Sequence, residues 1–150
     1  MSFWQALRIS SSALTAQRLR LDVISNNIAN AETTRTDEGG PYKRQDVMFA
    51  AQGRQLSFAS YLPISNKMSA NALNLNGVEV SEVITDETPG TSVYDPTHAD
   101  ADAEGMVAYP NVNLVVEMTN MMSATRSYEA NLSLIEAARA MAISAIEIGR

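Results

Sequence analysis

The fold is decided by residues 111–150, whose sequence is NVNLVVEMTNMMSATRSYEANLSLIEAARAMAISAIEIGR. Between Asn111 and Ile148 there is no proline or glycine, so nothing in the stretch forces a helix to break. Side chains recur at alternating steps of three and four, with only Arg139 interrupting, as in a helix that presents one continuous stripe to a partner. This first stripe consists of Met118, Met121, Thr125, Tyr128, Leu132, Ile135, Ala142 and Ile146.

A second apolar stripe lies about 100° around the same helix. Its members are Leu134, Ala138, Met141, Ala145 and Ile148. A helix that is apolar on two adjacent faces needs more than one neighbour. The stretch therefore predicts a long C-terminal helix with two packed faces, capped by Asn111 or Asn113.

Residues 2–30 predict a second helix. Its main stripe alternates steps of four and three through Phe3, Leu7, Ser10, Leu14, Gln17, Leu21, Ile24 and Ile28. A further set recurs every seven residues and points largely the other way, namely Ile9, Ala16 and Val23. The helix is expected to end near Asn30, because asparagine tolerates the left-handed conformation that closes helices.

The two terminal helices carry matching stripes, so they are natural partners of each other. We expect residues 1–30 and 111–150 to form one helical coiled-coil domain, and residues 31–110 to form a small β-rich insert with loops. The predicted class is α+β. The residues expected to pack in the coiled coil or between subunits are Leu7, Leu14, Leu21, Ile24, Ile28, Met118, Met121, Tyr128, Leu132, Ile135, Met141 and Ile146.

Within the insert, strands are predicted at 45–49, 55–62, 77–85, 92–94 and 106–109. Loops are predicted at 31–41, 65–76 and 95–105, where Gly, Pro, Asn and Asp accumulate. The insert has few large apolar residues and predicts only a small core. Lys43, Arg44 and Arg54 are interpreted as solvated strand charges in preference to a phosphate site.

Composition excludes several classes of function. The net charge of -6 argues against a nucleic-acid partner, which favours a basic face. The absence of cysteine removes disulfides, thiol catalysis and thiolate metal sites. The N-terminus shows no basic segment followed by an apolar core, and no apolar run is long enough to span a membrane, so export would need another route.

The acidic loop 95–105 is the one stretch that imitates a chemical site. Asp100, Asp102, Glu104 and Gly105 have the spacing that begins a calcium loop, but the twelfth position is Asn111 instead of a glutamate. His98 is the only histidine, which makes a poor zinc site. We therefore expect no metal, cofactor or catalytic residue here, and a turn in which Asp95 accepts hydrogen bonds from backbone amides after Pro96. A metal-dependent enzyme that uses His98 and this loop stays open as an alternative. Metal that remains bound after dialysis would favour it.

Several stretches together resemble a known family. They are SNNIANA at 25–31, GGPYKRQ at 39–45, YDPTH at 94–98, EGMVAYPNVN at 104–113 and SYEAN at 127–131. This combination resembles bacterial flagellar rod and hook axial proteins, and within them the basal-body rod proteins of the C type, which are proximal rod subunits. The residues of this sequence that match the motifs of that family are Asn26, Asn27, Ala29, Asn30, Tyr94, Asp95, Pro96, His98, Gly105, Tyr109, Pro110 and Asn111.

The resemblance implies a structural subunit that polymerises into a helical axial tube, transmits motor torque and surrounds the export channel. It places the terminal helices inside the rod and the insert outside. It implies self-association, contact with other proximal and distal rod subunits and a rod-base adaptor, and unfolded export through the flagellar type III apparatus to the basal body, where the rod spans the periplasm. It implies no nucleic acid and no small-molecule substrate. The alternative is a non-flagellar coiled-coil or secretion-filament adaptor, which would share the helices but not the 94–98 and 104–113 stretches.

Overall fold

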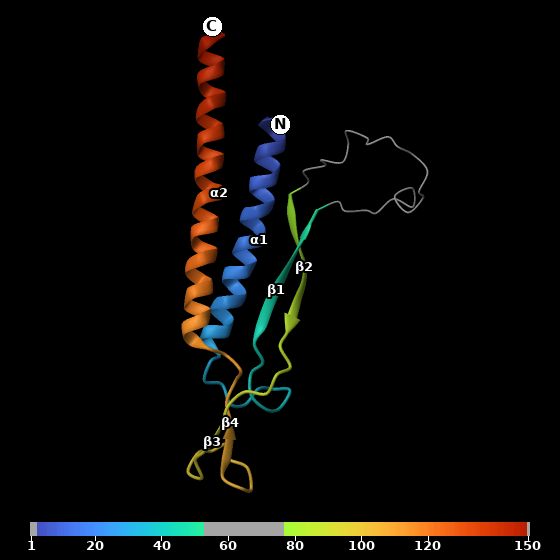
Figure 1. The fold of residues 1–150 in the computed structure, drawn as a ribbon, viewed down its shortest axis with the longest axis vertical. Helices are drawn as coiled ribbons and strands as arrows, with labels where there is room; N and C mark the ends of the chain where they lie inside the picture. The colour runs from blue at the N-terminus through green and yellow to red at the C-terminus, as the bar shows by residue number, and fades with distance from the viewer. Residues whose placement is uncertain (1–2, 53–76, 150) are drawn as a thin grey trace, which may run out of the picture.

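The computed structural model describes residues 3–52 and 77–149 (Figure 1). The described elements are α1 (Phe3–Ala29), β1 (Gln45–Ala51), β2 (Val78–Thr85), β3 (Ser92–Tyr94), β4 (Met106–Ala108) and α2 (Leu114–Ile148). The predicted α+β class, with a long helix at each end and a small antiparallel β insert between them, is confirmed. The strand predicted at 55–62, the loop predicted at 65–76 and Arg54 lie outside the described residues.

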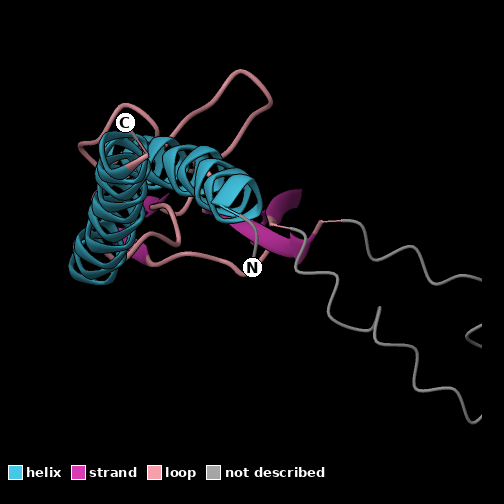
Figure 2. Ribbon diagram, turned by 90° about the horizontal axis from the view of Figure 1, so that it is seen from above, coloured by secondary structure: helices cyan, strands magenta, loops and turns pink. Residues whose placement is uncertain are grey.

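The two helices run antiparallel and pack side by side (Figures 1 and 2). Asn113 caps α2, because its side-chain oxygen accepts hydrogen bonds from the amides of Val115 and Val116 at 3.1 and 3.2 Å. Helix α2 has 35 residues and α1 has 27, so at the α-helical rise α2 is about 12 Å longer. The C-terminal end of α2 therefore extends beyond the start of α1. Neither described helix contains a segment long and apolar enough to cross a membrane.

The face that α2 turns toward the interior differs from the predicted first stripe. The α2 contact line alternates steps of four and three, and its buried or half-buried members are Glu117, Met121, Ala124, Tyr128, Asn131, Ile135, Ala138 and Ala142. Met118, Thr125 and Leu132 of the predicted stripe are exposed, whereas Ala138 of the second stripe is buried. Ala124 and Ala138 on this line have small side chains that let two helices approach closely. Helix α2 therefore turns this side toward α1 and leaves Met118 and Leu132 exposed.

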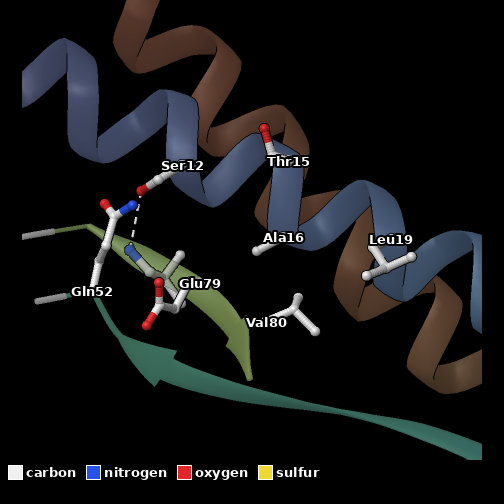
Figure 3. Close-up of a pocket in the computed structure, with 8 residues that line it drawn as sticks. Ser12, Thr15, Ala16, Leu19, Gln52, Glu79 and Val80 are labelled. Carbon is white, nitrogen blue, oxygen red and sulfur yellow. Dashed lines mark hydrogen bonds between the residues drawn. The ribbon is translucent and has the colours of Figure 1, made fainter. Parts of the chain in front are cut away.

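The second face of α1 is covered by the chain itself. Strands β1 and β2 form an antiparallel hairpin that lies along α1, and β3 and β4 form a separate two-stranded sheet at the far end of the molecule (Figure 1). Ala16 and Leu19 of α1 face Val80 of β2 across a shallow open pocket (Figure 3). Helix α1 therefore has the two neighbours that its two apolar faces require, α2 and the β1–β2 hairpin, within the same chain.

A close contact anchors the start of β2 on α1. The Ser12 hydroxyl accepts a hydrogen bond from the Val78 amide at 3.0 Å and donates one to the Ile9 carbonyl at 2.7 Å (Figure 3). Gly77 precedes this contact with φ of 34°, and a Cβ there would lie 2.3 Å from the Ser12 hydroxyl oxygen. Glycine is thus required both by the backbone conformation and by the space available.

Candidate assembly surface

Helix α2 exposes a large amount of apolar surface that the described part of the chain does not cover. Met141 is 65% exposed and Ile146 is 73% exposed, values far above those of residues in a folded core. The exposed large apolar residues of α2 are together named the α2 outer face. They are Leu114, Val115, Val116, Met118, Met122, Leu132, Leu134, Met141, Ile143, Ile146 and Ile148. Exposed apolar surface of this extent on one helix indicates a site of protein association.

Two grooves lie along this surface. One, of about 510 Å³, is formed where the start of α1 meets the later part of α2. It is lined by Phe3, Ala6, Leu134, Ala137, Ala138, Met141, Ala142 and Ala145. The other, of about 440 Å³, is lined by Met118, Met121 and Met122 together with Thr125, Arg126 and Glu129. Flexible thioethers adapt to irregular partner surfaces, so the second groove suits a packed protein contact.

At the end of the helix pair opposite the first groove, a buried polar cluster joins α1, β1 and α2. Glu117 is 0% exposed, and its carboxylate accepts a hydrogen bond from Arg44 Nε at 2.8 Å and one from Asn27 Nδ2 at 3.3 Å. Arg44 also pairs with Asp46 at 3.3 Å. Partial burial opposes the charge of Arg44, but its hydrogen bond with Glu117 and the charges of Glu117 and Asp46 raise its pKa above the ordinary value. The interpretation of Arg44 as a solvated charge is wrong, whereas Lys43 is exposed and pairs with exposed Glu87.

Asn27 is the centre of this cluster. It is 0% exposed, and its amide bonds both backbone groups of Gln45: Nδ2 donates to the carbonyl at 2.7 Å and Oδ1 accepts from the amide at 3.0 Å. Oδ1 also accepts from the Tyr42 hydroxyl at 2.8 Å, and Asn26 Nδ2 donates to the same hydroxyl oxygen at 3.3 Å. Burial, followed by the negative charge of Glu117, raises the pKa of Tyr42. A single side chain therefore fixes the first residue of β1 against the end of α1.

Asn111 connects the lead-in to α2 with the same cluster. Its side-chain oxygen accepts a hydrogen bond from the Arg44 amide at 2.9 Å. Its Nδ2 donates to the Asp86 carbonyl at 3.3 Å and to the Thr88 hydroxyl at 3.1 Å. The 25–31, 39–45 and 104–113 stretches, far apart in sequence, thus meet through these side chains, beside the buried ring of Pro110.

The 94–98 stretch lies apart from the cluster, at the end of β3 and the start of the loop that leads to β4. Asp95 accepts hydrogen bonds from the Thr97 hydroxyl at 2.7 Å and the Thr97 amide at 3.0 Å, which confirms the predicted turn. Those two bonds, the hydroxyl first, lower the pKa of Asp95. His98 Nδ1 accepts from the Asp100 amide at 3.1 Å, and Asp100 accepts from the Thr34 hydroxyl at 2.8 Å. Within residues 3–52 and 77–149, no three His, Cys, Asp or Glu side chains are grouped as metal ligands.

Other motif residues have simpler placements. Gly105 closes the β3–β4 loop with φ of 77°, and a Cβ there would lie 3.0 Å from the ring of exposed Tyr94. Asn30 donates to the Asn26 carbonyl at 2.9 Å near the end of α1. Ala29 and Pro96 are exposed, and Tyr109 is half-buried with its amide bonded to the Thr91 carbonyl at 2.8 Å.

The predicted packing residues divide into two groups. Within the helix pair, Ile24 is buried, and half-buried positions are held by Leu7, Leu14, Leu21, Ile28, Met121, Tyr128 and Ile135. The exposed group consists of Met118, Leu132, Met141 and Ile146. Sequence reasoning missed Glu117 as a buried residue. The available signal was its position, seven residues before Ala124 and fourteen before Asn131, on a line of small side chains.

Comparison with known proteins gives consistent results along the chain. Residues 7–35 match the family model described as "Flagella basal body rod protein", and residues 103–148 match the one described as "Flagellar basal body rod FlgEFG protein C-terminal". The chain is 44% identical to the flagellar basal-body rod protein FlgC of Bacillus subtilis, over 100% of both chains. It is 43% identical to FlgC of Borreliella burgdorferi, over 99% of this chain and 98% of the relative, and 34% identical to FlgC of Salmonella typhimurium, over 100% of both.

Proposed function

Since this chain belongs to the family of flagellar basal-body rod proteins, which are structural rod components, we propose that it is a subunit of the proximal rod. In this role it polymerises into a helical axial tube that surrounds the export channel and transmits motor torque. The observation that carries the proposal is the α2 outer face, an exposed apolar surface running along a helix of 35 residues. A subunit alone leaves that surface in water, whereas a rod covers it with the same neighbours in every subunit.

The two parts of the chain have different tasks in this proposal. Residues 1–30 and 111–150 form the helical domain on the inner side of the rod, and residues 31–110 form the insert on the outer side. The β1–β2 hairpin supports this orientation, because it covers one side of α1. The α2 outer face is then the side of the helical domain directed toward other subunits.

Within that division, the exposed packing residues make the subunit contacts. Met118, Leu132, Met141 and Ile146 project from the α2 outer face and would pack against helices of neighbouring subunits. The half-buried group, including Leu14 and Ile135, holds the chain's own helix pair together. The motif asparagines Asn26, Asn27, Asn30 and Asn111 serve the internal polar contacts.

The partners follow from the family. We expect contacts with copies of this chain, with other proximal and distal rod subunits and with the rod-base adaptor. The export apparatus of the flagellar type III system would deliver the chain unfolded to a rod that spans the periplasm. The acidic net charge of -6 gives no basis for a nucleic-acid partner.

Met141→Asp tests the proposal. Met141 is exposed in the subunit, so the substitution should leave its circular dichroism and thermal unfolding nearly unchanged. In a rod the new carboxylate would be buried without a partner in every subunit, which costs several kcal/mol per site. We expect loss of motility and of recoverable rods, with export of the variant retained.

The matched control is Glu136→Gln, which changes one exposed residue of the same helix and removes a charge instead of adding one. It should leave motility intact. Normal rods and swimming with Met141→Asp would show that this part of the α2 outer face is not an assembly contact, and would refute the proposed use of the surface.

A further inference from the structure

Glu117 is the one fully buried charged residue in the described part of the chain, and it lies at the beginning of the α2 contact line. Its carboxylate is held by Arg44, which precedes β1, and by Asn27, near the end of α1. We propose that this polar cluster sets the register of α1 against α2, so that one axial alignment of the two helices is selected from several that packing alone would permit.

One of the two heptad series on the α2 contact line distinguishes registers only weakly. After Glu117, the positions at steps of seven along α2 are Ala124, Asn131, Ala138 and Ala145, all with short side chains. A slide of one helix by seven residues, about 10 Å, places one of these short residues where another had been. Along this series the contacts are replaced by similar ones, as in a heptad interface whose repeats are alike. The other series of the contact line, Met121, Tyr128, Ile135 and Ala142, changes in size along α2 and distinguishes registers by packing.

The polar cluster removes this degeneracy. In a shifted register Glu117 leaves both Arg44 and Asn27, and an uncompensated carboxylate within a helix interface is strongly unfavourable. Arg44 does not follow α2 in such a shift, because the next residue, Gln45, is held on α1 by two hydrogen bonds between its backbone and the Asn27 side chain. The alignment of the helices is therefore tied to the position of the insert.

Such a cluster is expected to contribute specificity for one helix register, and not additional stability. A buried ion pair offsets its own desolvation poorly, and apolar residues of similar volume often give an equal or greater stability. Polar groups buried in helix pairs are best known for selecting one register, at a cost in stability. The cluster thus determines how far the C-terminal end of α2 extends beyond the start of α1 (Figure 1).

The register can be measured directly, because the chain contains no cysteine. Arg18→Cys and Glu147→Cys place one spin label on an exposed site of each helix, and pulsed electron paramagnetic resonance then reports the distance between the labels. The full chain is used, diluted with unlabelled chain to suppress intermolecular distances. The parent should give one distance.

Two variants remove the cluster in this labelled chain. Glu117→Gln removes the buried charge with little change of shape, and Arg44→Met with Glu117→Met replaces the pair by apolar side chains. Each should add a second distance displaced by about 10 Å. The matched control is Lys43→Met with Glu87→Met, which removes an adjacent but exposed ion pair and should keep the single distance.

A single distance in both cluster variants would overturn the proposal, because packing alone would then set the register. Two distances in the parent would overturn it as well. If the double variant does not fold, the distances measured in the Glu117→Gln variant alone test the proposal. The effect of the register on assembly rests on the proposed function. Loss of motility together with a second distance supports both the register role and the rod function. Loss of motility with a single distance refutes the register role and leaves the proposed rod function unaffected.

Discussion

Replacing Asn27 with alanine removes one side chain from the centre of the polar cluster. In the parent, Asn27 bonds the amide and carbonyl of Gln45, the hydroxyl of Tyr42 and the carboxylate of Glu117. The alanine variant keeps the helix, because alanine is the best helix former. What changes is that these groups lose a partner at a site with 0% exposure.

The size of the loss in stability depends on which of those groups water can reach in the variant. Glu117 Oε2 is buried and loses its hydrogen bond from Asn27, and an unsatisfied buried polar group costs about 1–3 kcal/mol, with charged groups at the upper end. The Gln45 backbone groups are half-buried and are partly rehydrated, and Tyr42 still contacts Asn26. We expect a total loss of about 3 kcal/mol in the free energy of unfolding. For a chain of 150 residues this lowers the Tm by about 6–12 °C.

Urea denaturation of the monomer, followed by far-ultraviolet circular dichroism, measures the loss. The control is Asn26→Ala, one residue earlier in the same helix, where the exposed side chain makes only a 3.3 Å hydrogen bond to Tyr42 and a 2.9 Å hydrogen bond with Asn30. That variant should lose about 0.5 kcal/mol. If the two variants unfold within about 1 kcal/mol of each other, the four contacts of Asn27 are not stabilising the fold as reasoned, since an unsatisfied buried group alone costs that much.

Two further predictions concern pH and backbone geometry. The pKa of Tyr42 is raised above 10.0 in the folded chain, so its contribution to stability is present below about pH 10 and is lost as the pH rises above that value. Tyr42→Phe should therefore reduce the fall in Tm at alkaline pH. The same alkaline fall in Tm in the variant and the parent would contradict this role of Tyr42. Gly77→Ala should destabilise the chain by about 1–3 kcal/mol, because the Cβ would meet Ser12 at 2.3 Å and φ is 34°. Its matched control, Gly39→Ala, has a positive φ of 87° but open space around the Cβ, so a loss as large as that of Gly77→Ala would show that backbone strain, and not the Ser12 contact, is responsible.

The candidate surface was only partly predictable from apolar spacing. The spacing marked Ile24, Tyr128 and Ile135 as packing positions, and these are buried or half-buried. It also placed Met118 and Leu132 on the line facing α1, where the structure has Glu117 and Asn131. Periodicity identifies an apolar face on one helix, but a helix that is apolar over a wide arc does not reveal which side the partner takes.

The sequence by itself determined the elements. The two long helices, their ends near Asn30 and Asn113, and four of the short strands follow from local patterns, because helix periodicity, capping and strand alternation act between residues close in the chain. The turn at Asp95 is also local, since its carboxylate bonds a residue two positions later.

Only the tertiary structure decided which faces meet. The contact of Arg44 with Glu117 spans 73 residues, and that of Asn27 with Glu117 spans 90. No local pattern encodes such a pairing, because it depends on where the insert returns the chain and on how closely two lines of small side chains approach. The same contacts covered the second face of α1 with the β1–β2 hairpin and left the α2 outer face exposed, since a helix can bury only the side that its partners reach.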